Sequence, residues 1–265
     1  MVPPRPGPSR RIPWRSVTLF CYNAEHHGVG RPPIKVSAII PAYNEERRIG
    51  AVLSALERAA LLDDILVVDD GSTDNTLGVL PTDNGVRSMR LADNIGKGGA
   101  MWAGALETDA DVILFLDADL VGLQPEHLRL ILDPVTAGEA DMCIGIFRGG
   151  RYWTDMAQKL VPYISGQRAI RRDMFLSVPQ VCRARSGVEV ALTHHARVNG
   201  WRVEWVPLAG ITHVMKEEKM GPLRGFKARL SMYWEIGSYI SGERCRHGAR
   251  SVIRSVRRLL GTEHG

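Results

Sequence analysis

The sequence predicts an α/β fold in which a mostly parallel β-sheet is covered by helices on both faces. Short apolar or β-branched runs alternate with segments whose apolar residues recur at helical spacing. Acidic residues and glycines follow several of the apolar runs, as in residues 69–74 and 117–119. This alternation is typical of parallel sheets, whose ligands bind at the carboxyl ends of the strands.

The first part of the fold is expected to contain four strands and the helices that connect them. The segment 45–61 is predicted to be a helix because its apolar residues, from Ile49 through Leu53 to Ala60, share one helical face. The predicted strands are 35–40, 65–68, 86–91 and 112–116, and the predicted helices are 45–61, 73–80 and 98–108.

The second part continues with a helix at 125–137, opened by Pro125 in its first turn, and a strand at 141–146. A helix at 188–198 and strands at 201–206 and 210–214 follow. Arginines are dense between residues 147 and 185, which suggests contacts with anions. Two amphipathic helices are expected in the C-terminal segment.

Three regions differ in charge. Residues 1–33 hold seven of the fifteen prolines and a net charge of +4, and we expect a flexible leader there. Residues 34–215 carry −5 and form the predicted catalytic domain, whereas residues 216–265 carry +6 and form a basic helical tail. A nucleic-acid-binding protein would be basic throughout, so no nucleic-acid partner is expected.

Composition excludes several other classes. A chain of 265 residues with 45% hydrophobic residues is too long for a disulfide mini-protein and too apolar for a disordered chain. The four cysteines form no C-x-x-C pair, which argues against a thiolate zinc site. No apolar run approaches the ~18 residues of a membrane span, and no secretory signal is recognised, so we expect a cytoplasmic protein.

The residues that follow the predicted strands limit which ligands the protein can bind. Pro41-Ala42-Tyr43-Asn44-Glu45 follows the first strand where a dinucleotide-binding fold would need G-x-G-x-x-G, and the Gly-Lys-Gly around Lys97 is not a phosphate-loop motif. Lys97, flanked by glycines, is suited to contact a phosphate. Asp117 and Asp119 leave the fourth strand together, and paired carboxylates there suit Mg²⁺ or Mn²⁺ carrying a diphosphate.

Four motifs in this order resemble those of the family 2 glycosyltransferases, which have the GT-A fold. They are Pro41-Ala-Tyr-Asn-Glu45, Asp69-Asp-Gly-Ser-Thr-Asp74, Asn94-x-Gly-Lys-Gly-Gly-Ala100 and Asp117-Ala-Asp119. The resemblance covers residues 35–215 and implies transfer of a sugar from a nucleotide diphosphate sugar, assisted by a divalent cation. It also implies a set of donor-binding residues, which are Pro41, Ala42, Tyr43, Glu45, Asp70, Lys97, Asp117 and Ala118.

The metal site resembles those of two branches of the family. Dolichol-phosphate mannosyltransferase-like enzymes usually have a glutamine two residues after the DAD motif, and this chain has Val121 there. His213 is similar to the late metal-binding histidine of glucosyl-3-phosphoglycerate synthases. The resemblance therefore implies Asp119 and His213 as metal ligands, and Asp119 as a catalytic residue.

Polar residues after position 160 are the candidates for binding the molecule that accepts the sugar. Gln167 and Arg168 are candidates for binding an acceptor phosphate, because the guanidinium fork suits phosphate oxygens. Glu189 is the candidate catalytic carboxylate: it would serve as a general base for a hydroxyl acceptor. With a phosphate acceptor no base is needed, and Glu189 would orient the acceptor or cap a helix.

The leading hypothesis is a metal-dependent glycosyltransferase that uses a nucleotide sugar, with uridine preferred over guanosine. Its acceptor would bear a phosphate or be a polyprenyl-type lipid, and the basic tail would rest on an anionic membrane surface or pack on the catalytic domain. A homodimer is compatible with this reading. The alternatives are a catalytically degenerate relative that binds nucleotide or membrane, and a sugar-phosphate nucleotidyltransferase, which would need a glycine- and arginine-rich loop after the first strand.

Overall fold

The computed structural model describes residues 33–81, 85–148, 165–178, 181–184 and 187–213, without the side chains of Arg148, Arg183 and His213. The predicted leader, apart from its last residue, and the two predicted C-terminal helices lie outside the described residues. Most of the arginine-rich segment after residue 148 does so too. All elements below belong to a compact unit that begins at Ile34.

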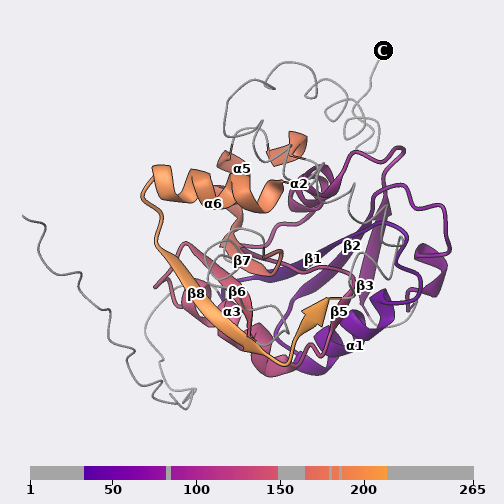
Figure 1. Cartoon of the computed structure of the whole chain (residues 1–265), viewed down its shortest axis with the longest axis horizontal. Helices are drawn as coiled ribbons and strands as arrows, with labels where there is room; N and C mark the ends of the chain where they lie inside the picture. Colours follow the sequence, from indigo (N-terminus) through magenta and orange to yellow (C-terminus); the bar gives the residue numbers. More distant parts are fainter. Residues whose placement is uncertain (1–32, 82–84, 149–164, 179–180, 185–186, 214–265) are drawn as a thin grey trace, which may run out of the picture. The chain divides into compact units, whose positions relative to one another are not determined.

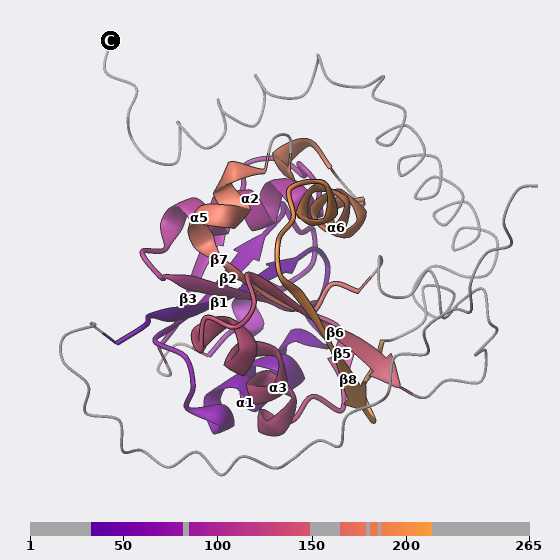
Figure 2. The same ribbon diagram turned by 90° about the vertical axis from the view of Figure 1, so that its left-hand side faces the viewer.

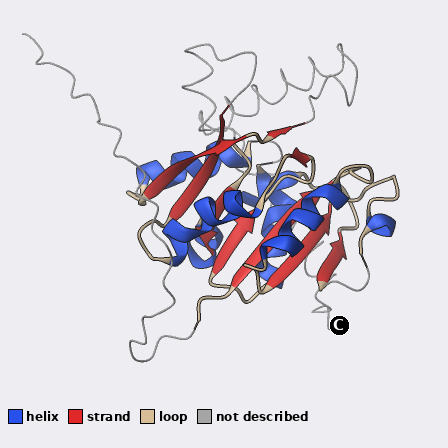
Figure 3. Cartoon of the chain, turned by 90° about the horizontal axis from the view of Figure 1, so that it is seen from below, coloured by secondary structure: helices blue, strands red, loops and turns tan. Residues whose placement is uncertain are grey.

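The core of this unit is one seven-stranded sheet with the order β3-β2-β1-β4-β7-β6-β8 (Figures 1 and 3). β1 pairs in parallel with β2 and β4, β2 pairs in parallel with β3, and β6 pairs in parallel with β8. β7 runs antiparallel to both β4 and β6. The strands are β1 (Val36–Ala42), β2 (Asp64–Asp69), β3 (Val86–Arg90), β4 (Val112–Phe115), β6 (Met142–Arg148), β7 (Arg168–Arg171) and β8 (Val203–Ala209). The predicted mostly parallel sheet is confirmed.

Helices cover both faces of the sheet (Figure 2). α1 (Ile49–Ala59) and α3 (Pro125–Thr136) pack on one face, while α2 (Lys97–Glu107), α5 (Arg172–Ser177) and α6 (Val188–Val198) pack on the other. Alternate residues of β1 supply the two cores: Ala38 and Ile40 join the α1 side, whereas Ile39 joins the α2 side. The two-sided burial explains why the parallel strands are apolar throughout.

Glycines let α2 lie close to its neighbours. A Cβ atom on Gly104 would lie 2.7 Å from a methyl carbon of Ile39 on the sheet, and one on Gly98 would lie 2.2 Å from the carbonyl oxygen of Ala184. The close approach fixes the start of α2, where Lys97 lies, against the segment that precedes α6.

The predicted helix at 73–80 is wrong, because only a 3₁₀ turn, η1 (Leu77–Val79), forms there. The Thr73 and Asp74 amides donate to the side chain of Asn44, and the Thr76 amide and hydroxyl donate to the carboxylate of Asp74. Side-chain hydrogen bonds of this kind compete with the helical pattern. The predicted helix at 45–61 begins only at Ile49, after a turn closed on the carbonyl of Glu45.

Several short elements were not predicted. They are β5 (Leu120–Val121), β7, α5 and η2 (Val181–Arg183). β9 (Thr212–His213) lies within the predicted strand 210–214 but has only two residues. β5 and β9 form a separate antiparallel pair in which Leu120 lies opposite His213. Elements of two to six residues carry too little periodicity to be recognised in the sequence.

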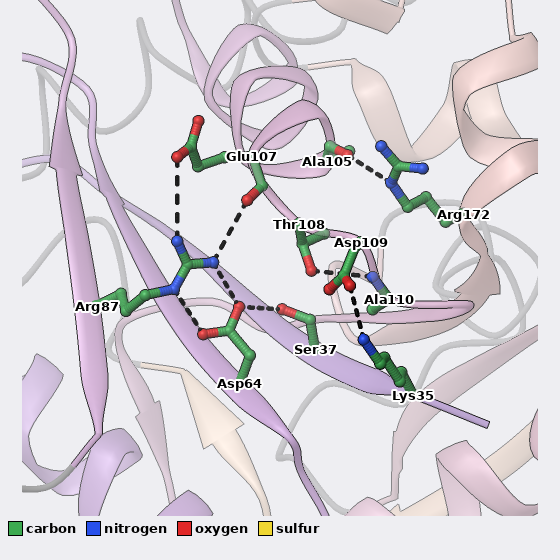
Figure 4. Close-up of polar contacts among 10 residues, drawn as sticks. All are labelled: Lys35, Ser37, Asp64, Arg87, Ala105, Glu107, Thr108, Asp109, Ala110 and Arg172. Atoms are coloured by element: carbon green, nitrogen blue, oxygen red, sulfur yellow. Dashed lines mark hydrogen bonds and ion pairs between the residues drawn. The ribbon is translucent and has the colours of Figure 1, made fainter. Parts of the chain in front are cut away.

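Ion pairs join the elements at the amino ends of the parallel strands (Figure 4). Arg87 donates from Nε and from one terminal nitrogen to the two carboxylate oxygens of Asp64, each at 2.8 Å, and Ser37 donates to the same carboxylate. Arg87 also donates to the carbonyl oxygen of Glu107 at the end of α2, and Lys35 pairs with Asp109 at 2.7 Å. These contacts tie β1, β2 and β3 to α2.

Replacing Asp64 by asparagine is expected to lower the free energy of unfolding by about 0.5–1 kcal/mol at pH 7, as for other partly exposed ion pairs. Hydrogen bonds from Arg87 hold the pKa of Asp64 below its usual range. A lowered pKa stabilises the fold above the unfolded-state pKa, and this contribution is lost as the pH falls through the folded-state pKa. In urea unfolding, Asp64→Asn should therefore lower the free energy of unfolding at pH 7, and lower it less below about pH 4.

Asp109→Asn is the matched control, since the Asp109 side chain is 83% exposed in its pair with Lys35. A smaller loss is expected there. Equal deficits for Asp64→Asn at pH 7 and pH 3 would contradict the ion-pair account.

Candidate active site

The strand order places a crevice at the carboxyl ends of β1 and β4. The chain leaves β1 toward β2 and β3 on one side, and β4 adds to the other side of β1. Such a reversal opens a gap between the loops that follow the two central strands, which is where open α/β sheets bind ligands. The loops after β1, β2 and β4 carry the polar motifs found in the sequence.

A pocket of about 190 Å³ lies in this region. Its lining residues are Pro41, Ala42, Tyr43, Glu45, Asp70, Lys97, Asp117, Ala118 and Asp119. The structure thus brings together all the residues expected to bind the donor, along with the expected metal ligand Asp119. Tyr43 is 45% exposed at this site, whereas Asp70 is buried.

Asn44 joins the loops after β1 and β2. It adopts a left-handed backbone conformation with φ of 57°, which asparagine tolerates better than most residues. The side-chain oxygen of Asn44 accepts a hydrogen bond from the backbone N–H of Thr73 at 2.8 Å. The backbone N–H of Asn44 donates to the hydroxyl of Ser72 at 2.9 Å. The contacts hold the pocket residues on either side of Asn44, Tyr43 and Glu45, in a fixed loop.

Asp70 anchors the loop that leads into α2. One of its carboxylate oxygens accepts the Ile95 amide at 2.8 Å, and the other accepts the Gly96 amide at 2.9 Å. Gly96 has φ of 88°, a conformation that favours glycine. The carboxylate therefore sets the position of Lys97, the next residue and the first of α2.

Lys97 bridges two carboxylates from different parts of the chain. Its Nζ donates to Oδ1 of Asp117 after β4, and to Oε1 of Glu189 in the first turn of α6. Burial alone would lower the pKa of Lys97, but the charges of Asp117 and Glu189 outweigh it and raise the pKa above its ordinary value. Lys97 is therefore a permanent cation that joins the loop after β4 to α6.

Gln167 holds the other oxygen of Asp117. Its Nε2 donates to Asp117 Oδ2 at 2.7 Å, and its Oε1 lies 3.1 Å from the hydroxyl of Ser165. Gln167 is fully buried. Both carboxylate oxygens of Asp117 are therefore held by neighbouring side chains.

Gly166 leaves the space that the Lys97–Asp117 ion pair fills. A Cβ atom there would lie 2.5 and 2.6 Å from the carboxylate oxygens of Asp117 and 2.6 Å from Lys97 Nζ. Gly166→Ala is expected to lower the free energy of unfolding by about 1–3 kcal/mol, because overpacking has this cost.

Urea unfolding of Gly166→Ala measures this effect. Gly50→Ala is the matched control, since a Cβ at Gly50 meets no atom within 4 Å. Equal stability of Gly166→Ala and the wild type would show that the ion pair does not need this gap.

Arg168, at the start of β7, is fully buried. Its two terminal nitrogens donate to backbone carbonyl oxygens, one to that of Ser165 and the other to that of Glu189 at 3.4 Å. Burial lowers the pKa of Arg168 to about 10, while the charges of Glu189 and Asp117 act in the opposite direction. In this structure Gln167 and Arg168 face the Asp117–Glu189 group from within the fold, and their expected contact with an acceptor phosphate stays a prediction.

Asp119 lies between β4 and the small β5–β9 pair. It is partly exposed and lines the pocket. Because β5 pairs with β9, the backbone of His213 lies opposite Leu120, the residue that follows Asp119. No group of three or more histidine, cysteine or acidic side chains able to hold a metal is found among the described side chains, which do not include that of His213.

Asn44, Ser165 and Gly166 lie within motifs found in the sequence, but their structural roles were not predicted. Asn44 joins two loops, Gly166 leaves a gap beside Asp117, and Ser165 donates to Gly145 and Gln167. The roles of Asn44 and Gly166 depend on contacts with segments distant in sequence, which local motifs do not reveal.

Comparison with known proteins matches residues 37–184 to the family model "Glycosyl transferase family 2". The chain is 31% identical to the undecaprenyl-phosphate mannosyltransferase of Micrococcus luteus over 81% of this chain and 100% of that protein. It is 30% identical to the polyprenol monophosphomannose synthase of Mycolicibacterium smegmatis over 84% of this chain and 93% of that protein.

Glucosyl-3-phosphoglycerate synthases are the second group of relatives. The synthase of Mycobacterium tuberculosis is 29% identical over 42% of this chain, and the match spans only 37% of that protein. A crystal structure of the M. tuberculosis enzyme with Mn²⁺, UDP and phosphoglyceric acid has a TM-score of 0.59 at 25% identity, covering 75% of this chain and 78% of that one. Another, with Mg²⁺ and UDP, has a TM-score of 0.58 at 26% identity, covering 75% and 79%. The predicted GT-A fold is confirmed.

Proposed function

Because the chain belongs to the family 2 glycosyltransferases, we propose that it transfers a sugar from a UDP-sugar to a phosphate-bearing acceptor with the help of Mg²⁺ or Mn²⁺. The observation that carries the proposal is the pocket at the ends of β1, β2 and β4. It collects Asp70, Lys97, Asp117 and Asp119 beside Tyr43, an arrangement able to hold a nucleoside and a diphosphate.

The donor would lie with its nucleoside against the loop fixed by Asn44, where Tyr43 offers an exposed aromatic ring. Lys97, a permanent cation, lies at the same pocket and would face the diphosphate. Uridine is preferred because the structural relatives above were crystallised with UDP.

The divalent cation would be held by Asp119 and His213. A carboxylate suits both metals, and an imidazole is more compatible with Mn²⁺ than with Mg²⁺. The register of β5 with β9, which sets the backbone of His213 beside the residue after Asp119, is consistent with a shared ligand set. When bound, the metal would neutralise the charge of the leaving diphosphate.

In the reaction, the bond between the anomeric carbon and the UDP oxygen breaks, and a bond to an acceptor oxygen forms. A phosphate acceptor already carries a negative oxygen, so no base is needed. A hydroxyl acceptor would pass its proton to Glu189, which lies at 2.5 Å from Lys97 in the first turn of α6.

A polyprenyl phosphate is the favoured acceptor. The two relatives named for polyprenyl-type lipids align over 100% and 93% of their own lengths, against 37% for the phosphoglycerate enzyme. The acceptor would then place the protein at an anionic membrane surface, for which the +6 charge of residues 216–265 is suited. No helix in the described part of the chain is long and apolar enough to span a membrane.

A transfer assay tests the proposal. The purified protein is incubated with Mn²⁺, a series of UDP- and GDP-linked hexoses, and either undecaprenyl phosphate in detergent or 3-phosphoglycerate, and the products are identified by mass spectrometry. We expect a glycosylated lipid phosphate from a UDP-sugar. Nucleotide binding without any product would support a degenerate relative instead, and product from GDP-sugars alone would overturn the uridine preference.

A further inference from the structure

The ion pairs around Lys97 leave one buried cation unexplained. Lys97 serves both Asp117 and Glu189, two carboxylates that are 17% and 8% exposed. Arg168 is the fourth charged group of this cluster, and it is completely buried. With two cations and two carboxylates, the cluster formed by Lys97, Arg168, Asp117 and Glu189 is electrically neutral.

Arg168 makes no side-chain ion pair within hydrogen-bond distance among the described residues. Within the described part of the chain its guanidinium donates to two carbonyl oxygens, and its Nε has no hydrogen-bond partner there. A buried arginine in this state is costly, because each unpartnered donor loses its hydration without replacement. Packing alone would be better served by an apolar side chain of similar length.

The two carbonyl groups that Arg168 binds belong to segments with roles in the site. Ser165 lies two residues before Gln167, which donates to Asp117, and Glu189 binds Lys97 through its carboxylate. The guanidinium therefore connects the approach to β7 with the first turn of α6. Thr193 donates to the same Glu189 carbonyl at 2.8 Å, so that this peptide group is held from two sides.

We propose that Arg168 is a positioning residue: it joins the approach to β7 to the first turn of α6 through the carbonyl groups of Ser165 and Glu189, and it supplies the second positive charge of the cluster. The second charge matters when Lys97 turns toward a donor diphosphate, because Glu189 would otherwise remain buried with no cation near it. The proposal extends the proposed function, since it rests on Glu189 acting at the acceptor side of the same site.

Charged groups from each packed element face Glu189 in this arrangement. They are Lys97 from α2, Asp117 from the loop after β4 and Arg168 from β7. Removing Arg168 leaves two carboxylates and one ammonium, so the buried cluster would carry a net negative charge.

The test is a double-mutant cycle in urea at pH 7, in which Arg168→Met and Arg168→Lys are each measured in the wild-type background and in Glu189→Gln. Arg168→Met should destabilise the wild type more than it destabilises Glu189→Gln, which lacks the carboxylate charge. In Arg168→Lys, which retains the charge, the loss of stability should be the same in both backgrounds. Arg171→Met is the matched control, because Arg171 lies on the same strand but is exposed and pairs with Asp173.

The cycle needs no enzymatic activity. In transfer assays, kcat should fall about tenfold in Arg168→Met while KM for the donor changes little, as expected for a residue that acts through the position of Glu189. If Arg168→Met fails to fold, the transfer assay is made with Arg168→Lys, in which kcat should still fall because lysine loses the fork that binds two carbonyls; an unchanged kcat there would overturn the proposal.

Additive unfolding energies for Arg168→Met and Glu189→Gln, with an effect of Arg168→Met no larger than that of Arg171→Met, would overturn the proposal. Failure of the proposed function would look different. The wild type would then transfer no sugar, while the cycle would still report on Arg168.

Discussion

Replacing Asp119 by alanine is expected to reduce sugar transfer about 1,000-fold or more, because the proposed cation loses its carboxylate ligand and the leaving diphosphate is no longer neutralised. Asp119 is partly exposed at the pocket between β4 and β5, so its removal creates no buried cavity. The fold should therefore be unchanged. Transfer is measured with saturating UDP-sugar over a range of Mn²⁺ concentrations, and stability is measured by urea unfolding.

Asp109→Ala is the control for this variant. Asp109 lies at the opposite, amino end of the sheet and is 83% exposed. It should transfer sugar at the wild-type rate. Wild-type transfer by Asp119→Ala would refute the site assignment, whereas a loss accompanied by unfolding would be reinvestigated with Asp119→Asn, which preserves the shape of the side chain and should still lose at least about 100-fold.

Replacing Lys97 by methionine is expected to lower the free energy of unfolding by about 2–4 kcal/mol, because it removes the cation shared by two largely buried carboxylates. Donor affinity should also fall, since Lys97 lines the pocket. Both effects are measured on the same protein, by urea unfolding and by calorimetric titration of UDP with Mn²⁺.

The pH dependence distinguishes this explanation from simple loss of packing. The raised pKa of Lys97 means that its ion pairs stabilise the fold fully below the unfolded-state lysine pKa of about 10.4, and that this contribution is lost as the pH rises toward the folded-state pKa, so the loss of stability in Lys97→Met should shrink above about pH 10.4. Lys35→Met is the control, because Lys35 forms an exposed pair with Asp109 and its replacement should change the stability far less. A deficit independent of pH would indicate that methionine merely packs poorly.

The strands at the centre of the sheet were predictable because their burial is visible in the sequence. β1, β2 and β4 are apolar over four or more consecutive residues and end in polar motifs. The pocket followed from the same pattern, since parallel strands bring their carboxyl ends to one edge. For this reason the donor residues expected from three separate motifs line one pocket.

The antiparallel strand β7 could not be predicted, since its sequence, Arg-Ala-Ile-Arg, is short and has a charged residue at each end. Its arginines suggested anion contacts, but Arg168 is buried and binds carbonyl groups, while Arg171 is exposed and binds Asp173. Which of two arginines lies inside depends on the neighbours of β7 in the sheet, β4 and β6, and these are distant in sequence.

The helix predicted at 73–80 failed for a related reason. Its apolar residues fit a helix, but Asn44, from another loop, binds the amides that would begin it. A contact between segments about 30 residues apart cannot be read from local periodicity. The same contact builds the loop next to Tyr43, so the departure from the local pattern lies at the proposed site.

Calorimetric titration of UDP and GDP into the purified protein, with and without Mn²⁺, tests the central claim most directly. The account predicts that UDP binds in the presence of Mn²⁺, that binding weakens strongly without the metal or in Asp119→Ala, and that GDP binds less tightly. Absence of binding of either nucleotide with Mn²⁺ present would contradict the assignment of this pocket to a nucleotide-sugar donor.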